Sequence, residues 1–257
     1  MIRLLAALAL LALPGTALAA PFSVVLLGDS ITFGQVSEPV GPSYAQLLTD
    51  SLGSDFEVTN IGCGGTSSLD WTRSQGTVIC GGASGFVLPD LYEGRALPTL
   101  PADLVTVLLG TNDAIGFFEP GIVAVADYRD AILEIATSLL LDGADQVMLM
   151  TPPPNFKDPL AAAYLVGYRA QVLDICGAPG DAILCGPDVY ALLGPSDFGN
   201  SVHPNGAGSA KIASALDPAI RSAVPEPGSA ALVLLGLAAL TLRPLPRTVA
   251  LRVRKTG

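Results

Sequence analysis

The chain holds a single histidine, His203, which lies late in the sequence in the segment Ser201-Val202-His203-Pro204-Asn205. Near the start, Ser30 follows the apolar run of residues 24–27 in the segment Gly28-Asp29-Ser30. A serine hydroxyl is a weak nucleophile unless a base that titrates near neutral pH takes its proton, and histidine is the usual base. The pair therefore predicts acyl-transfer chemistry, provided that the fold brings Ser30 and His203 together.

Two further segments carry groups that such chemistry needs. They are Asn60-Ile61-Gly62-Cys63-Gly64-Gly65-Thr66 and Gly110-Thr111-Asn112-Asp113. The negatively charged oxygen that develops during acyl transfer is stabilised by preorganised N–H donors. The Ser30 backbone amide, a glycine amide and the side-chain amide of Asn112 are donors of this kind. Glycine also lets the backbone approach a substrate closely.

The elements that would position these residues are strands and helices in alternation. Short apolar runs rich in valine and leucine predict strands that are buried on both faces. The runs cover residues 23–27, 56–60, 104–109 and 146–150, with a shorter fifth strand near 182–184. The helix-like segments between them cover residues 43–52, 127–141, 161–175 and 205–223. This alternation predicts a three-layer α/β/α sandwich around a mostly parallel sheet of about five strands.

In an open parallel sheet, ligands bind at the carboxyl ends of the strands. Ser30, the glycine-rich segment and Asn112 each follow one of the first three expected strands, so we expect them at the same edge of the sheet. Residues 62–101 are rich in glycine, serine, threonine and proline and show no clear period. We interpret them as one long loop, and long loops in compact domains are often functional. Trp71 in this loop either touches the substrate or simply packs.

The four cysteines form two local pairs along the sequence. Cys63 precedes Cys80, and Cys176 precedes Cys185. In an oxidising compartment these pairs would form two disulfides, and the alternative is free buried thiols. Neither pair has the close spacing of a zinc knuckle, and a single histidine cannot supply a mixed zinc site. We therefore expect no metal.

Four sequence blocks together resemble those of the SGNH, or GDSL-type, hydrolases. They are Gly28-Asp29-Ser30-Ile31-Thr32-Phe33-Gly34, Asn60-x-Gly62-x-x-Gly65, Gly110-Thr111-Asn112-Asp113 and His203-Pro204-Asn205. The resemblance spans residues 22–223 in the family's order and implies a flavodoxin-like fold and an enzyme without metal or cofactor. No Gly-x-Ser-x-Gly sequence occurs, which argues against the α/β-hydrolase fold.

The resemblance also implies roles for single residues. Ser30 would be the nucleophile and His203 the base. Gly65 and Asn112, with the Ser30 amide, would form the oxyanion hole. Gly62 would be needed only for the turn in its block, and Asp29 and Asp113 would organise their loops.

One position departs from the family pattern. The family usually has an aspartate three residues before the histidine, and this chain has Asn200 there. Three interpretations remain open. The Asn200 amide oxygen accepts a hydrogen bond from the imidazole and orients it, as an asparagine does in papain-like proteases. Alternatively, Asp197 supplies the carboxylate, or a backbone carbonyl or water supports a dyad of Ser30 and His203.

Both ends of the chain differ from its middle. Residues 1–19 combine a basic start, a short apolar stretch and small residues, which predicts a secretory signal peptide cleaved near Ala19. Residues 224–257 contain Pro225-Glu226-Pro227, an apolar run and a basic tail, an order that resembles the PEP-CTERM sorting signal of Gram-negative bacteria. That resemblance implies removal by an exosortase, membrane contact only through the C-terminal segment, and delivery to the cell surface or extracellular matrix. A plain C-terminal anchor is the alternative. The hydrolase domain would span residues 20–223.

Charge and the resemblance together limit the partners. The chain has 13 basic and 23 acidic side chains. The two ends carry six of the basic residues, so the remaining domain is strongly acidic, which argues against nucleic acid and anionic membranes as partners. We expect a secreted serine esterase that acts on a small ester or an acylated glycan. The alternatives are a lysophospholipase or short-chain lipase, and a non-catalytic matrix or carbohydrate-binding protein that retains the fold.

Overall fold

The computed structural model describes residues 20–73, 78–80, 86–88, 90–116, 121–178, 180, 182–200 and 202–225. The chain divides into two compact units, Met1–Arg221 and Ser222–Gly257, and every described strand lies in the first. The signal peptide expected at 1–19, and all but the first two residues of the sorting signal expected at 224–257, lie outside the described residues. Among the helices that are described, none is both long and apolar enough to span a bilayer.

A five-stranded parallel sheet forms the centre of the first unit, in the order β2-β1-β5-β6-β7. The strands are β1 (Phe22–Gly28), β2 (Phe56–Asn60), β5 (Ala102–Leu108), β6 (Ala144–Leu149) and β7 (Ile183–Cys185). The expected five-stranded parallel sheet is confirmed. Because all five strands run the same way, the segments that follow β1, β2 and β5 leave the sheet at one edge and side by side.

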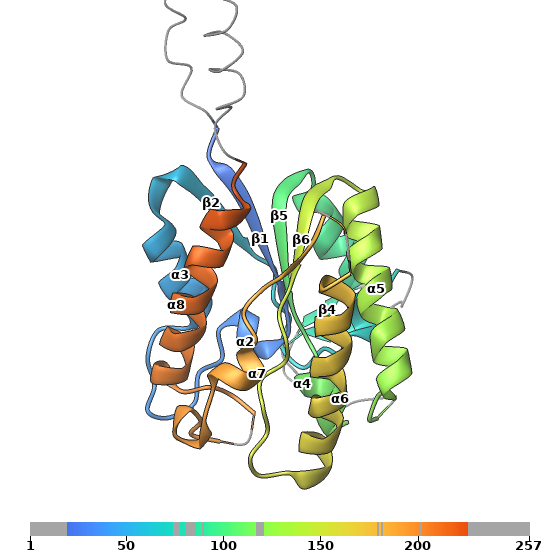
Figure 1. The fold of residues 1–257 in the computed structure, drawn as a ribbon, viewed down its shortest axis with the longest axis vertical. Coiled ribbons are helices and arrows are strands. Elements are labelled where there is room, and N and C mark those ends of the chain that lie inside the picture. Colours follow the sequence, from blue (N-terminus) through green and yellow to red (C-terminus); the bar gives the residue numbers. More distant parts are fainter. Residues whose placement is uncertain are drawn as a thin grey trace, which may run out of the picture. The chain divides into compact units, whose positions relative to one another are not determined.

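Helices cover both faces of the sheet. Figure 1 shows α3 (Tyr44–Leu52) and α8 (Gly206–Ala223) on one side, and α5 (Val125–Leu141) and α6 (Pro159–Cys176) on the other. The predicted three-layer sandwich is therefore confirmed. Side-chain caps set the first residues of α6 and α8. Asp158 accepts hydrogen bonds from the Leu160 and Ala161 amides, and Asn205 accepts from Ala207 and Gly208.

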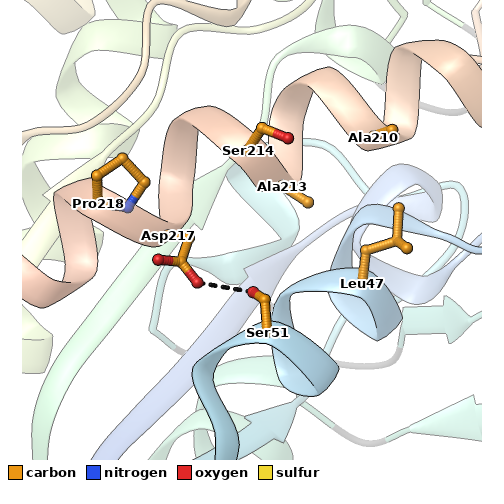
Figure 2. Close-up of a pocket in the computed structure, with 7 residues that line it drawn as sticks. All are labelled: Leu47, Ser51, Ala210, Ala213, Ser214, Asp217 and Pro218. Carbon is orange, nitrogen blue, oxygen red and sulfur yellow. Dashed lines mark hydrogen bonds between the residues drawn. The ribbon is translucent and has the colours of Figure 1, made fainter.

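The helices α3 and α8 lie against each other as well as against the sheet. Ser51 donates a hydrogen bond to Asp217 over 2.7 Å, and Arg221 donates to the other oxygen of the same carboxylate. Small side chains leave an open groove between these helices (Figure 2). Its lining residues are Leu47, Ser51, Ala210, Ala213, Ser214, Asp217 and Pro218. None of the predicted site residues lies in this groove.

The interpretation of residues 62–101 as one unstructured loop is wrong. The described part of this segment, which lacks residues 74–77, 81–85 and 89, contains five short elements. They are η2 (Leu69–Trp71), the antiparallel hairpin of β3 (Val78–Cys80) and β4 (Phe86–Leu88), a π-helical turn η4 (Tyr92–Ala96) and η5 (Leu97–Thr99). Elements of three to five residues are too short to show a period in the sequence. Buried side chains of this segment, among them Trp71, Leu91 and Tyr92, join the core under α5.

Both predicted disulfides are confirmed. Cys63 is bonded to Cys80, and Cys176 is bonded to Cys185. The first bond joins the glycine-rich segment to the hairpin, and the second joins the end of α6 to β7.

Candidate active site

The short helix α2 (Ser30–Phe33) begins directly after β1 and presents Ser30. Asp29 caps this helix, because its Oδ1 accepts a hydrogen bond of 2.9 Å from the Ile31 amide. Ser30 is then the first residue of the helix, and its own hydroxyl is not used as a cap. The Ser30 Oγ lies 3.0 Å from His203 Nε2, although the two residues are 173 positions apart. The fold therefore brings together the two residues that the sequence singled out.

Ser37 ties the histidine loop to the segment that carries Ser30. Its Oγ donates to the His203 carbonyl over 2.6 Å and accepts from the Gly199 amide over 2.8 Å. Its backbone amide donates to the Pro204 carbonyl. Ser37 is buried, so these bonds are protected from water. Ser37 could not be identified from the sequence, because a serine in a loop carries no motif, and its only signal is its closeness to Ser30 in the chain.

His203 itself is partly buried. Burial lowers its pKa below the ordinary value of 6.5, since the charged imidazolium loses water contacts. The ring is therefore neutral at pH 7 and able to accept a proton.

Asn200 contacts His203 in a way that the sequence analysis did not anticipate. The Asn200 Oδ1 accepts hydrogen bonds from two backbone amides, those of Val202 at 2.9 Å and of His203 at 2.7 Å. The Asn200 Nδ2 lies 3.2 Å from His203 Nδ1. The amide nitrogen, rather than the expected amide oxygen, thus faces the imidazole.

Asp197 does not take the place of the missing carboxylate in this structure. Its side chain is buried, and its Oδ2 accepts hydrogen bonds from Lys211 Nζ at 2.7 Å and from the Gly194 amide at 2.8 Å. Burial alone would raise its pKa, but these two donors hold the pKa below its ordinary value. Asp197 therefore anchors the loop that leads into the histidine segment.

In the glycine-rich segment after β2, the amides of Gly62 and Gly65 differ in their hydrogen bonding. The Gly62 amide donates to Asn60 Oδ1 over 2.9 Å, and a Cβ at this position would lie 2.3 Å from the Phe33 amide nitrogen. Gly62 is thus needed for close packing against α2. Gly65 has a φ of 85°, which favours glycine, and its amide makes no hydrogen bond to any described residue. That amide remains able to bind a substrate oxygen.

Asn112 lies in the short helix α4 (Thr111–Ile115), directly after β5. Its Nδ2 donates to the Thr66 carbonyl over 2.8 Å, and an amide nitrogen has a second hydrogen left for another acceptor. Trp71 is fully buried and donates from Nε1 to Thr66 Oγ1 over 3.0 Å. Trp71 therefore packs beneath the loop and supports Thr66, rather than lining the site.

Two buried carboxyl groups lie under the site. The Asp113 carboxylate accepts hydrogen bonds from the backbone amide and the hydroxyl of Ser68, which joins the loops after β2 and β5. Burial raises the pKa of Asp113 to about 6 and that of Asp29 to about 7. Among the described residues, no group of three or more histidine, cysteine or acidic side chains could hold a metal ion.

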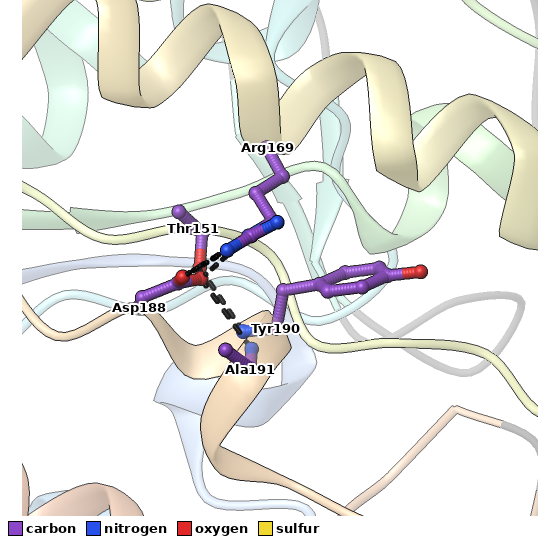
Figure 3. A network of polar contacts seen from close by, with 5 residues as sticks. All are labelled: Thr151, Arg169, Asp188, Tyr190 and Ala191. Carbon is purple, nitrogen blue, oxygen red and sulfur yellow. Dashed lines mark hydrogen bonds and ion pairs between the residues drawn. The ribbon is translucent and has the colours of Figure 1, made fainter.

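A polar network fixes the loops after β6 and β7 at the same edge of the sheet (Figure 3). Arg169 from α6 donates to both carboxylate oxygens of Asp188. Thr151 donates to Asp188 Oδ1 over 2.8 Å and accepts from the Tyr190 amide over 3.0 Å. This network was not predicted from the sequence, and it holds the segment that leads to Asp197 and His203.

Comparisons with known proteins agree with this architecture. The model of the GDSL-like Lipase/Acylhydrolase family matches residues 26–211. No curated protein matches the chain. An aryl esterase from M. smegmatis has 20% identity and a TM-score of 0.59, covering 79% of this chain and 100% of that one.

Two further solved structures share the fold. The carbohydrate acetylesterase Est24 from Sinorhizobium meliloti has 16% identity and a TM-score of 0.55, over 78% of this chain and 99% of that one. The acetylxylan esterase Axe2 from Geobacillus stearothermophilus, solved as a catalytic mutant, has 19% identity and a TM-score of 0.56, over 80% and 95%. With the family model covering most of the described fold, this chain belongs to the GDSL-like lipase/acylhydrolase family and is a hydrolase that acts on ester bonds.

Proposed function

We propose that the protein is a serine esterase that hydrolyses carboxylic esters through an acyl-enzyme, with Ser30 as nucleophile and His203 as base. The observation that carries this proposal is the 3.0 Å separation of Ser30 Oγ and His203 Nε2. That distance is within the range required for direct proton transfer between a nucleophile and its base.

The reaction divides into two steps. The Ser30 oxygen attacks the ester carbonyl carbon while its proton passes to His203 Nε2. The tetrahedral intermediate then collapses, and Nε2 returns the proton to the leaving alcohol. Water attacks the resulting acyl-enzyme in the same way, with His203 again accepting the proton. Nε2 then returns this proton to the Ser30 oxygen as the carboxylic acid leaves.

The oxyanion of each intermediate would be held by the Gly65 amide, the Ser30 amide and the Asn112 side chain. Two observations support these donors: the Gly65 amide is unbonded among the described residues, and Asn112 has one N–H beyond its bond to Thr66. An Asn112→Ala variant should lose about 10²- to 10³-fold in kcat, the usual effect of removing one such donor.

Small acyl esters, in particular acetyl groups on a glycan, are the substrate class that we favour. Two proteins of the same fold are described as a carbohydrate acetylesterase and an acetylxylan esterase. Export with a signal peptide cleaved near Ala19, and surface delivery by an exosortase that recognises residues 224–257, would place the enzyme among extracellular polysaccharides. A lysophospholipase or short-chain lipase is the second candidate, because the family includes lipases.

The test is a series of para-nitrophenyl esters from acetate to octanoate with the purified protein. Ser30→Ala should abolish hydrolysis, and Ser54→Ala, which changes an exposed serine in η1 (Gly53–Asp55), should not. A preference for acetate supports the glycan esterase, and a preference for octanoate supports the lipase. Hydrolysis that survives in Ser30→Ala contradicts the proposed mechanism. No hydrolysis with any ester would favour a non-catalytic binding protein.

A further inference from the structure

The Asn200 side chain is fixed in one orientation by the backbone around it. Its Oδ1 accepts from two amides, Val202 N and His203 N. If the amide group were rotated by half a turn, Nδ2 would face these two N–H groups, and both hydrogen bonds would be replaced by contacts between donors. The loop therefore decides which end of the amide faces the imidazole.

The end that faces the imidazole is a donor. Asn200 Nδ2 lies 3.2 Å from His203 Nδ1, and an amide NH₂ group has hydrogens but no acceptor site. This contact is a hydrogen bond only if Nδ1 carries no proton. A neutral imidazole has a single ring proton, so that proton must then be on Nε2, which lies 3.0 Å from Ser30 Oγ.

We propose that Asn200 holds the neutral His203 imidazole in the tautomer that carries its proton on Nε2, so that Ser30 and His203 rest in an inactive form. This inference depends on the roles of Ser30 and His203 proposed above. Asn200 is a positioning residue in this account, since it contacts only the base.

The consequence for the reaction follows from the position of the proton. Nε2 can take the Ser30 proton only when it is unprotonated, which places the ring proton on Nδ1. That proton would then point at the Asn200 NH₂ group. Each turnover must therefore begin from a disfavoured tautomer, or Asn200 must turn and give up its two backbone hydrogen bonds. In serine proteases an asparagine in place of the triad aspartate causes the same tautomer error and lowers kcat about 10⁴-fold.

An aspartate at position 200 would remove the conflict. One carboxylate oxygen could keep both backbone amides while the other accepts a proton from Nδ1. We expect Asn200→Asp to raise kcat/KM by at least about tenfold and by at most about 10⁴-fold. The new carboxylate should also raise the pKa of His203, and so move the acidic limb of the pH profile to higher pH.

The tautomer can be read directly by nitrogen NMR, because His203 is the only histidine in the chain. With ¹⁵N-histidine in the full-length protein at a pH where the ring is neutral, the wild type should show an unprotonated Nδ1 and a protonated Nε2. Asn200→Asp should show the reverse. A wild-type Nδ1 that carries the proton overturns the proposal, whether or not any variant folds.

Asn155→Asp is the matched control. Asn155 Oδ1 also accepts from two backbone amides, those of Lys157 and Asp158, and among the described residues this side chain makes no hydrogen bond to His203. The control should change neither the tautomer nor the pH profile. Equal rates for the wild type and a folded Asn200→Asp variant would overturn the claim that the tautomer limits the reaction. If instead Ser30→Ala keeps full activity, the proposed mechanism fails, while the NMR result still decides the tautomer.

Discussion

The Asp29 carboxyl group should make the stability of this fold decrease between acidic and neutral pH. Asp29 is 1% exposed, and only one of its oxygens has a hydrogen-bond partner among the described residues. Burial raises its pKa from 3.8 to about 7, and the Asp113 carboxylate adds to the rise. The Thr111 hydroxyl lowers this pKa only in part, since no bond of normal geometry joins it to the unpaired Oδ2.

The sign follows from proton binding. Between pH 3.8 and about 7 the folded state holds a proton on Asp29 that the unfolded state has released. The free energy of unfolding therefore decreases as pH rises through this window. Below pH 3.8 and well above pH 7, the contribution of Asp29 to it does not change with pH. At about 1.36 kcal/mol for each pKa unit, the full change corresponds to about 4 kcal/mol.

Asp29→Asn isolates this contribution. The asparagine oxygen can still accept from the Ile31 amide, and its NH₂ group can donate to the Thr111 hydroxyl, which has no partner among the described residues. The variant cannot ionise, so it should unfold at a higher urea concentration than the wild type at pH 8. At pH 4.5 the two should differ much less, because Asp29 is protonated in the folded wild type.

The assay is urea denaturation of both proteins at several pH values from 4.5 to 8, with unfolding monitored by circular dichroism. Asp130→Asn is the control, since Asp130 is an exposed carboxylate on α5. If the difference between Asp29→Asn and the wild type is the same at both ends of the pH range, Asp29 is ionised throughout and the reasoning is refuted.

Three further predictions concern the site and its supports. Because burial lowers the pKa of His203, the acidic limb of kcat/KM should have its midpoint below pH 6.5, and a pH–rate profile with a midpoint above that value would contradict it. Ser37→Ala should lower the free energy of unfolding by about 1–3 kcal/mol and reduce kcat/KM, since the His203 carbonyl and the Gly199 amide lose a buried partner; unchanged kinetics would show that Ser37 does not position His203. Replacing Cys63 and Cys80 together by alanine should lower the free energy of unfolding by about 3 kcal/mol in the chain-entropy model. The measurement is urea denaturation of this variant and of the wild type without reductant. If reduction of the wild type has little effect on its unfolding, this disulfide is not formed.

The central sheet could be predicted from the sequence because β1 is a continuous apolar run, although the edge strand β2 contains polar residues and is not buried on both faces as expected. Residues 24–27 in β1 are at most 3% exposed, so nothing polar interrupts the run. Ser30 and His203 could be predicted because each stands in a recognisable block. The elements between Leu69 and Thr99 could not, because each is three to five residues long and their buried side chains contact distant parts of the chain.

Supporting residues were harder to predict than the proposed catalytic pair. Ser37 and Arg169 act through bonds to partners that are more than 15 positions away, Ser37 to Gly199 and His203, and Arg169 to Asp188. Serine and arginine are common residues, and neither stands in a motif here. Their roles depend on which loops meet at the edge of the sheet, which only the three-dimensional arrangement determines.

Asn200 shows why a single exchanged residue cannot be judged by its type alone. An amide oxygen and a carboxylate oxygen are both acceptors, so the sequence permits Asn200 to replace the family's aspartate as the orienter of His203. The structure shows that this position has two acceptor tasks, one toward the backbone amides of Val202 and His203 and one toward the imidazole. A carboxylate has two acceptor oxygens and can perform both, whereas an amide has one and presents a donor to the second partner. The effect of the exchange on catalysis is therefore set by the loop backbone, because two backbone amides already donate to the only oxygen of the Asn200 side chain.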